Sequence, residues 1–157
     1  TCTMECTRRT LTLARAKSYA KERFNASLQQ YWSSNSTSRY KDLNIPMPKG
    51  PSPELTLPRR NLGHLLAART GHGDFAAYHH RWAHDDALLT CSCGRDKTPE
   101  HFFFCWKGRN IERIKTPEAC RGPKEAIDWL LSTVRGATTF STWCTNTRFF
   151  IDIQRRY

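Results

Sequence analysis

Four residues with metal-binding side chains are concentrated in the segment 91–105, and they strongly limit how this part of the chain can fold. Cys91 and Cys93 are separated by one residue, and His101 precedes Cys105 by four. Residues i and i+4 of a helix lie on one face, and a glycine directly after the two cysteines permits a sharp turn. Thiolates and imidazoles are the ligands that zinc takes in structural sites. The spacing therefore predicts a structural Zn²⁺ site formed by Cys91, Cys93, His101 and Cys105.

A helix is expected to carry the second pair of ligands. Thr98 is predicted to cap this helix, and Pro99 to occupy its first position. A site with four protein ligands leaves no open position for a substrate water, so zinc here would stabilise the fold rather than catalyse a reaction. Two alternatives stay open, because the C-x-C spacing is tighter than the usual C-x-x-C. The segment could hold a core histidine beside buried thiols, or it could form a disulfide.

The chain is strongly basic. Its 157 residues include 25 Lys and Arg against 14 Asp and Glu, which is a formal net charge of +11. This balance favours polyanionic partners, nucleic acid first and an anionic membrane surface second, although an ordinary solvated surface fits the charge equally well. The sequence contains no apolar run near the roughly 20 residues that a transmembrane helix needs, so no membrane span is predicted.

The hydrophobic pattern predicts an all-α fold in three parts. From about residue 10 to 32, apolar residues recur at spacings of three and four, which is typical of a long amphipathic helix. Residues 1–32 are therefore assigned to an N-terminal helix. Residues 33–57 are rich in Ser and Pro and are predicted to be an extended linker, because proline disfavours helix. Residues 58–157 are predicted to form a small helical domain that contains the zinc knuckle at 91–105.

Helix-capping and helix-breaking residues predict where the first helices of this domain begin and end. One helix is expected to begin near Pro58 and to end at Gly71, because glycine adopts the left-handed cap conformation easily. Asp74 is predicted to cap the next helix, because a short carboxylate can accept the free backbone N–H groups of the first turn.

The C-terminal part of the domain is predicted to be less regular at its start. Residues 107–121 show no helical pattern and are expected to be an irregular basic stretch. Pro123 is predicted to begin a helix that ends at residues 135–136. A last short helix would contain Phe140, and the apolar tail 149–153 is expected to return to the core.

The cysteines outside the metal motif are compatible with either a secreted or an intracellular protein. They are even in number, so two disulfides are possible if the protein is secreted. Asn25 and Asn35 each begin an N-glycosylation pattern, which matters only in the secretory pathway. The chain begins at Thr1 rather than Met, so we expect a processed product or an excised fragment. The cysteines concerned are Cys2, Cys6, Cys120 and Cys144.

A group of histidines is the only other candidate for chemistry. His80 and His84 are four residues apart, and Asp85 and Asp86 could add oxygen ligands. We interpret these histidines, together with His72 and His79, chiefly as surface groups, because no glutamate occupies the position that a zinc hydrolase helix needs. The sequence also lacks a phosphate-binding glycine loop and a Ser/His/Asp order. We therefore predict that the chain is not an enzyme.

Two blocks of the sequence resemble the C-terminal region of fungal non-LTR retrotransposon polyproteins of the LINE-type, Tad-like group. The first consists of residues 57–60 followed by 65–79, and the second is the cysteine–histidine segment 91–105. The resemblance extends from about Arg8 to Ile153. It implies a CCHC zinc knuckle and a nucleic-acid-binding role. It implies no catalytic residues, because the reverse transcriptase and RNase H carboxylates belong to other parts of such polyproteins.

The expected function is thus a zinc-stabilised domain that binds RNA or DNA without base specificity, in the nucleus or cytoplasm. The alternative is a secreted fungal effector, derived from such an element, that binds a host protein such as an immune receptor or its target. In the first case an exposed tryptophan could stack on an unpaired base. The residues predicted to contact phosphates are Arg59, Arg60, Arg69, Arg81, Arg95, Lys97, Lys107, Arg109, Arg113 and Lys115.

Overall fold

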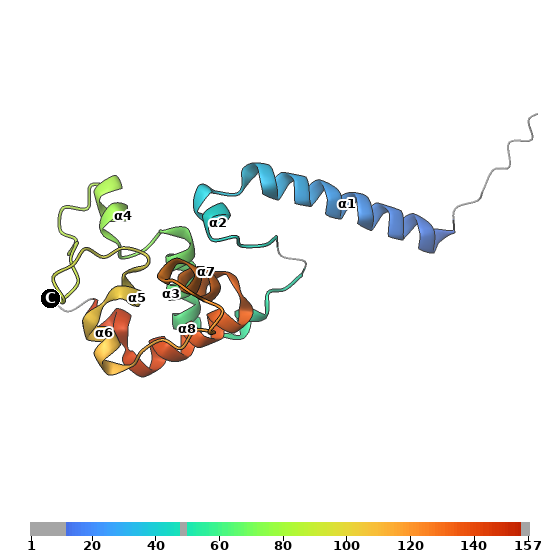
Figure 1. The fold of residues 1–157 in the computed structure, drawn as a ribbon. Helices are drawn as coiled ribbons and strands as arrows, with labels where there is room; N and C mark the ends of the chain where they lie inside the picture. The colour runs from blue at the N-terminus through green and yellow to red at the C-terminus, as the bar shows by residue number, and fades with distance from the viewer. Residues whose placement is uncertain (1–11, 48–49, 155–157) are drawn as a thin grey trace, which may run out of the picture. The chain divides into compact units, whose positions relative to one another are not determined.

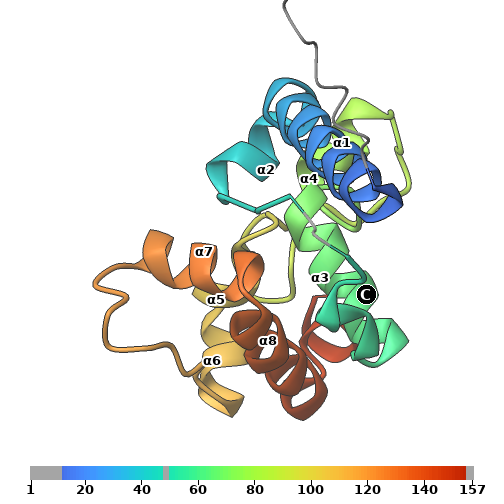
Figure 2. The same ribbon diagram turned by 90° about the vertical axis from the view of Figure 1, so that its right-hand side faces the viewer.

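The predicted all-α fold is confirmed by a computed structural model that describes residues 12–47 and 50–154 (Figures 1 and 2). All named elements in these ranges are helical, and the only β pairing among them is an isolated bridge between Thr90 and Asp96. The elements are α1 (Leu13–Asn35), α2 (Ser38–Asp42), η1 (Pro53–Thr56), α3 (Arg59–Thr70), α4 (Ala76–Arg81), α5 (His101–Phe104), α6 (Trp106–Ile111), α7 (Pro123–Ser132), α8 (Val134–Thr147) and η2 (Phe149–Ile153).

The chain divides into two compact units, residues 1–36 and 37–157. The described part of the first unit consists mainly of the predicted long helix, α1, which begins after its cap Thr12 and continues to Asn35. The side chain of Thr12 accepts the backbone N–H of Arg15 at 3.3 Å, which satisfies one free donor of the first turn. No helix in the described ranges is long and apolar enough to cross a membrane.

The structure differs from the predicted linker at residues 33–57, because this segment contains α2 and η1. Thr37 caps α2 by accepting the N–H of Tyr40, and the prolines lie too far along the chain to disturb this short helix. Pro53 occupies the first turn of η1, where its missing N–H costs nothing. Leu43 is only 4% exposed and joins the hydrophobic core. Residues 37–57 therefore belong to the second unit rather than to a spacer, and residues 33–35 complete α1.

The core of the second unit is built around α8. Helices α3 and α7 pack against α8 and against each other, and η1 and η2 also contact α8 (Figures 1 and 2). Leu65 from α3, Leu130 from α7 and Phe140 from α8 are fully buried. Burying each such side chain contributes roughly 1.5–3 kcal/mol, so this contact area is the main source of stability.

The junction of α7 and α8 differs from the prediction at Gly136, which was expected to end a helix. Gly136 instead lies in the first turn of α8, and a Cβ there would approach the carbonyl oxygen of Trp129 to 2.0 Å. Thr133 makes the junction, because its hydroxyl accepts the N–H of Gly136 at 3.0 Å and donates to Trp129 O at 2.8 Å. The glycine allows two backbones to approach closely, and its role as a helix breaker was therefore wrongly assigned.

Three further differences bear on the site. Residues 107–121 were expected to be irregular, but α6 occupies the first part of this stretch. The cap of α4 is Phe75 rather than Asp74, whose carboxylate is bound elsewhere. The cap of α5 is Glu100 rather than Thr98, so Pro99 precedes this helix, which is a single turn of four residues. The predicted return of the apolar tail is confirmed, because Phe149, Phe150 and Ile153 of η2 are buried in the core.

Candidate metal centre

The first two ligands lie at the tip of a narrow loop. Cys91 N–H donates to Arg95 O at 2.8 Å, and Gly94 N–H donates to Cys91 O at 2.8 Å. Gly94 has φ +87°, a left-handed conformation that an L side chain rarely adopts. This turn places the side chains of Cys91 and Cys93 next to each other, as the sequence predicted from the glycine.

The second pair of ligands lies on α5 and directly after it. Cys105 N–H donates to His101 O at 2.8 Å, which completes one helical turn and places both side chains on one face. The neighbouring Phe102 is 1% exposed and packs edge-on against Phe140, with ring centroids 4.9 Å apart. This contact holds the single turn of α5 against α8, and it thereby fixes the position of the two ligands.

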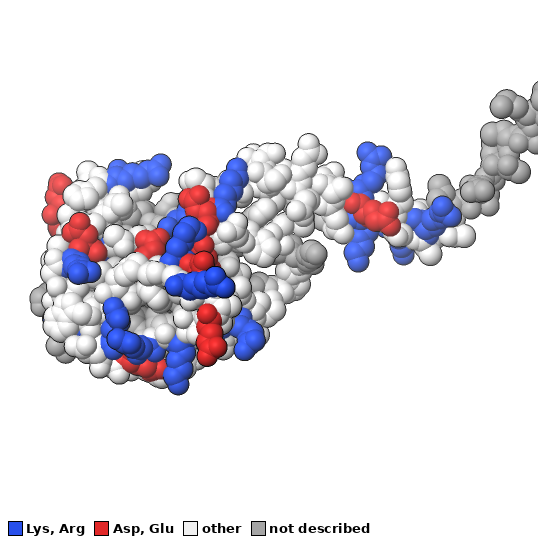
Figure 3. All heavy atoms as spheres, viewed as in Figure 1, with Lys and Arg blue, Asp and Glu red and all other residues white. Residues whose placement is uncertain are grey.

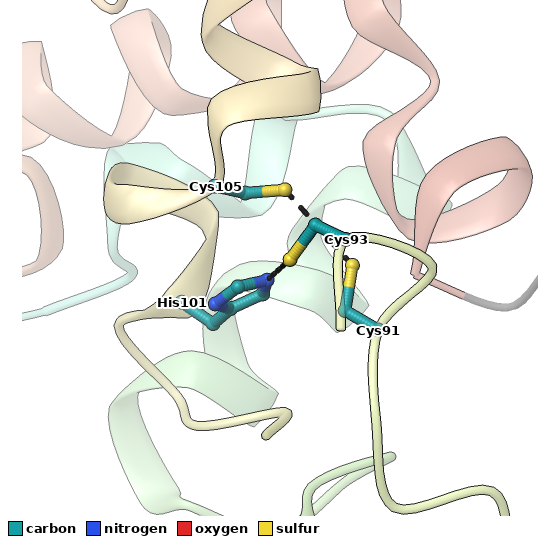
Figure 4. A group of neighbouring side chains, drawn as sticks. All are labelled: Cys91, Cys93, His101 and Cys105. Carbon is teal, nitrogen blue, oxygen red and sulfur yellow. Dashed lines mark hydrogen bonds between the residues drawn. The ribbon is translucent and has the colours of Figure 1, made fainter. Parts of the chain in front are cut away.

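The four side chains point toward one another (Figure 4). Cys93 Sγ lies 3.3 Å from His101 Nε2, and Cys91 Sγ lies 3.9 Å from Cys105 Sγ. One ligand atom from each of the four residues lies within 4.8 Å of the others. It is the only such group of three or more Cys, His, Asp or Glu side chains in the described ranges. The cluster can therefore hold a metal ion.

The distances agree with tetrahedral coordination. Zn–S bonds of about 2.3 Å and Zn–N bonds of about 2.0–2.1 Å place ligand sulfurs about 3.8 Å apart and sulfur and nitrogen about 3.6 Å apart. The contacts of 3.9 Å and 3.3 Å between the ligand atoms are close to these values.

Burial controls the protonation of the cluster. Removal from water raises the pKa of the Cys91 thiol to about 12 and also raises the pKa of Cys105. Burial, and secondarily the positive charge of Arg95, lowers the pKa of His101. Without a cation Cys91 and Cys105 are therefore thiols, and His101 is a neutral imidazole, at neutral pH. A bound divalent cation reverses this balance, because a coordinating thiol loses its proton.

Backbone N–H groups near Cys105 favour its thiolate form, which is the form that binds a metal ion. The backbone N–H groups of Lys107 and Gly108, in the first turn of α6, act to lower the pKa of Cys105 and so oppose the effect of burial. Cys105 is the cap residue of α6, so the N-terminal end of this helix faces the sulfur. A helix N-terminus favours negative charge, and donors to the ligand atoms orient and stabilise a thiolate.

The disulfide alternative is contradicted for the described cysteines. Cys91, Cys93, Cys105, Cys120 and Cys144 are all free thiols. Cys144 is buried in the core outside the cluster, and burial raises its pKa. The two disulfides that secretion would allow also involve Cys2 and Cys6, which lie outside the described residues.

Two of the ten predicted phosphate contacts are buried and already paired. Arg69 is 6% exposed and donates to both carboxylate oxygens of Glu54, at 2.6 and 2.5 Å. Lys97 is 2% exposed and lies 3.0 Å from a carboxylate oxygen of Asp74. Neither pair could be predicted from the sequence, since the members are 15 and 23 residues apart and no periodic pattern links them. The other eight cations are exposed or half-buried: Arg59, Arg60, Arg81, Arg95, Lys107, Arg109, Arg113 and Lys115.

The histidine group is also arranged differently from the expected i, i+4 pair. His84 contacts His79 rather than His80, which is exposed. This arrangement depends on a reversal of the chain after α4, where Ala83 has a positive φ of 49°.

Comparison with known proteins assigns neither a family nor a function to the chain. The chain matches no protein-family model, and neither a curated protein nor a solved structure shows significant similarity to it.

Proposed function

We propose that this protein is a nucleic-acid-binding domain, for RNA or DNA, whose fold is stabilised by Zn²⁺ at Cys91, Cys93, His101 and Cys105. The observation that carries the proposal is the position of α6. This helix starts at the last ligand of the cluster and presents an aromatic ring and cations to solvent. The bound ion would thus fix the surface that contacts nucleic acid.

Zinc is the ion that best suits the ligands. Three thiolates and one imidazole are soft to borderline donors, which disfavours Mg²⁺ and Ca²⁺. Four protein ligands fill a tetrahedral shell and give a structural site. The role proposed for the ion is to hold the loop of Cys91 and Cys93 against α5 and α6, and no reaction step is assigned to it.

The surface of α6 combines the two features of single-strand recognition. Trp106 is 52% exposed, and Lys107 Nζ lies 5.6 Å from the centre of its ring. Arg109 and Arg113 line a cavity of about 300 Å³ whose wall includes Phe104, which is 41% exposed. Stacking of bases on aromatic rings and contacts of cations with phosphates are the usual basis of binding without sequence preference.

The charge distribution favours a local interface over a uniform basic field. Figure 3 shows acidic side chains among the Lys and Arg side chains of the face that it draws. Phosphate contacts would therefore come from particular cations rather than from the net charge of +11 alone. The resemblance to a retrotransposon region supports the same class of partner, and it motivates the assignment of no catalytic role.

The proposal is tested by measuring fluorescence anisotropy of short single- and double-stranded RNA and DNA with the zinc-loaded protein over a salt series. We expect log Kobs to fall linearly with log salt. Trp106→Ala should weaken single-strand binding by about 1–3 kcal/mol, roughly 5- to 150-fold. The double variant Arg109→Ala/Arg113→Ala should flatten the salt slope by about 0.7 per lost phosphate contact on a single strand.

Lys124→Ala is the matched control, because it removes one exposed positive charge on α7, outside the proposed surface. It should leave both affinity and slope close to those of the unaltered protein. An effect of Lys124→Ala equal, per charge removed, to that of Arg109→Ala/Arg113→Ala would contradict a local interface on α6. Absence of salt-dependent binding to all four nucleic acids would exclude the proposed function and favour a protein partner, as in the effector alternative.

A further inference from the structure

His79 and His84 form a second cluster of potential metal ligands, apart from the cysteine-rich one. Their Nδ1 atoms lie 3.0 Å apart. His79 belongs to α4, and the chain reverses after this helix so that His84 N–H donates to His79 O at 3.1 Å. The positive φ of Ala83 makes this reversal possible and directs the two imidazole rings toward each other.

A buried ion pair orients His79. Its Nε2 lies 3.1 Å from Asp74 Oδ1, and the same carboxylate accepts two contacts from Lys97 Nζ at 3.0 and 3.1 Å. Lys97 is 2% exposed, so its ammonium requires a partner, which the carboxylate of Asp74 supplies. Gln154 Nε2 donates to Asp74 O at 2.8 Å and fixes the backbone of that residue as well. The carboxylate is therefore held in one orientation, toward His79.

This arrangement selects one tautomer for each ring when both imidazoles are neutral. A carboxylate only accepts hydrogen bonds, so His79 carries its proton on Nε2 and has a lone pair on Nδ1. His84 must then carry its proton on Nδ1 to donate across the 3.0 Å contact. Two ring nitrogens thus share one proton between them in the metal-free protein.

The same two nitrogens suit a metal ion. Bonds of about 2.0–2.1 Å at angles between octahedral and tetrahedral values place two coordinating nitrogens about 2.9–3.4 Å apart. The Nδ1 distance of 3.0 Å lies within this range. A histidine that binds a metal usually donates its other N–H to a carboxylate, which is the contact that His79 makes with Asp74. Transfer of the shared proton to Nε2 of His84, by exchange with water, would keep both rings neutral and release both Nδ1 lone pairs to an ion.

Open space adjoins the two rings. His79 and His84 line a cavity of about 380 Å³, together with Tyr78, Asp86 and Lys97. Two imidazoles supply only part of a coordination shell, so water or an added ligand from the cavity would fill the rest. Such a site would be open and would bind its ion more weakly than a closed four-ligand site. Imidazole nitrogen favours Zn²⁺, Cu²⁺, Ni²⁺ or Co²⁺ over Mg²⁺ and Ca²⁺.

We propose that the Nδ1 atoms of His79 and His84 form a second, open binding site for a divalent transition metal ion, with Asp74 as the carboxylate that positions His79. The site is independent of the proposed zinc knuckle and of nucleic-acid binding. In the sequence the i, i+4 spacing of His80 and His84 pointed to a different pair, because the reversal at Ala83 could not be anticipated.

The test starts from full-length protein that holds one equivalent of Zn²⁺ in the cysteine cluster. Further Zn²⁺ is titrated by calorimetry, and ¹⁵N-labelled histidine rings are followed by NMR. We expect one additional equivalent to bind and to shift the Nδ1 signals of His79 and His84. His84→Ala and His79→Ala should each lose this equivalent. His80→Ala, which removes an exposed histidine of the same segment, should retain it.

Circular dichroism of each variant checks that the fold is kept, and the NMR spectrum of the one-zinc protein provides a second test. There His79 should show the Nε2–H tautomer and His84 the Nδ1–H tautomer. The proposal is overturned if no second equivalent binds, if His84→Ala retains it, or if His80→Ala loses it. Binding that leaves the Nδ1 signals of His79 and His84 unchanged would also overturn it.

Discussion

At the scale of single residues, buried charges are paired within the second unit. Arg69 donates to Leu131 O at 2.5 Å as well as to Glu54, and so joins η1, α3 and α7. Hydrogen bonding to Arg69, against the opposing effect of burial, lowers the pKa of Glu54. The folded protein therefore binds the Glu54 proton more weakly than the unfolded chain does. The resulting stability is present above the unfolded pKa and is lost as pH falls through the folded pKa.

Glu54→Gln should lower the free energy of unfolding by about 3–5 kcal/mol at neutral pH, because it leaves the guanidinium of Arg69 buried without an anion. Urea-induced unfolding monitored by circular dichroism gives this value. The variant should also lose less stability than the unaltered protein as the pH falls below about 4.3, since the titrating group is absent. Asp152→Asn, which breaks the exposed pair with Arg148, is the control and should be neutral. Equal losses in the two variants would contradict this account.

Two glycines in helices should respond in opposite directions to alanine. Gly136→Ala should destabilise the protein by at least about 3 kcal/mol, because the new Cβ would overlap the carbonyl of Trp129 and force α7 and α8 apart. Gly63→Ala should stabilise it by up to about 1 kcal/mol, because nothing lies within 4 Å of the new Cβ on α3. Thermal unfolding of both variants measures the difference. A stable Gly136→Ala protein would contradict the close approach of these backbones.

At the scale of elements, single caps make sharp corners between short helices. Thr133 ends α7 and caps α8, and Cys105 ends α5 and caps α6. In each case one residue satisfies backbone groups of two helices, so the chain changes direction without a loop. The second corner also carries a ligand of the candidate metal centre. A change in that ligand would therefore alter both the site and the direction of α6.

Thr133→Ala should cost about 1 kcal/mol, and up to about 2, because the N–H of Gly136 loses its acceptor at a partly buried position. Thr138→Ala is the matched control, since this threonine is exposed within α8 and its hydroxyl bonds only to Val134 O. The control should be neutral or slightly stabilising, because alanine has the higher helix propensity. Chemical denaturation measures the midpoints of the two variants. Equal midpoints would contradict the role of Thr133 as a cap.

At the scale of the second unit, the candidate metal centre links segments that are distant in sequence. Cys91 Sγ lies 3.7 Å from Ile153 O, and Gly108 of α6 packs against Trp143 and Phe149. Trp143 Nε1 also donates to Glu112 O at 2.8 Å, just after α6. The cluster is thus connected to α8 and η2, and loss of a bound ion should weaken the core as well as the loop.

Removal of metal should therefore lower the unfolding midpoint of the whole second unit. Structural zinc contributes roughly 10 kcal/mol or more in small zinc modules, against a total stability of about 5–15 kcal/mol for a typical domain. We expect a chelator, Cys105→Ser and His101→Ala each to produce a large loss in differential scanning calorimetry. Cys120→Ser, outside the cluster, should behave like the unaltered protein and keep its response to chelator. A melting curve that chelator leaves unchanged would contradict a structural metal.

Local signals in the sequence were sufficient for the helical class, the long helix α1, the end of α3 at Gly71 and the four-residue metal cluster. Each depends on a short-range rule: apolar periodicity, a left-handed glycine, or ligands separated by one turn of loop or helix. The distances around Cys91, Cys93, His101 and Cys105 confirm that these side chains come together. The rules succeed there because neighbouring residues supply nearly all of the geometry.

Contacts between residues distant in sequence could not be predicted from such short-range rules. The burial of Arg69 and Lys97, the close approach at Gly136 and the pairing of His79 with His84 all depend on packing that brings separate segments together. From neighbouring residues alone, each of these positions is interpreted as a surface cation, a helix breaker or a member of an i, i+4 histidine pair. The tertiary structure gives each a different role, because a charge or a backbone group that is removed from water must find its partner wherever the fold places one.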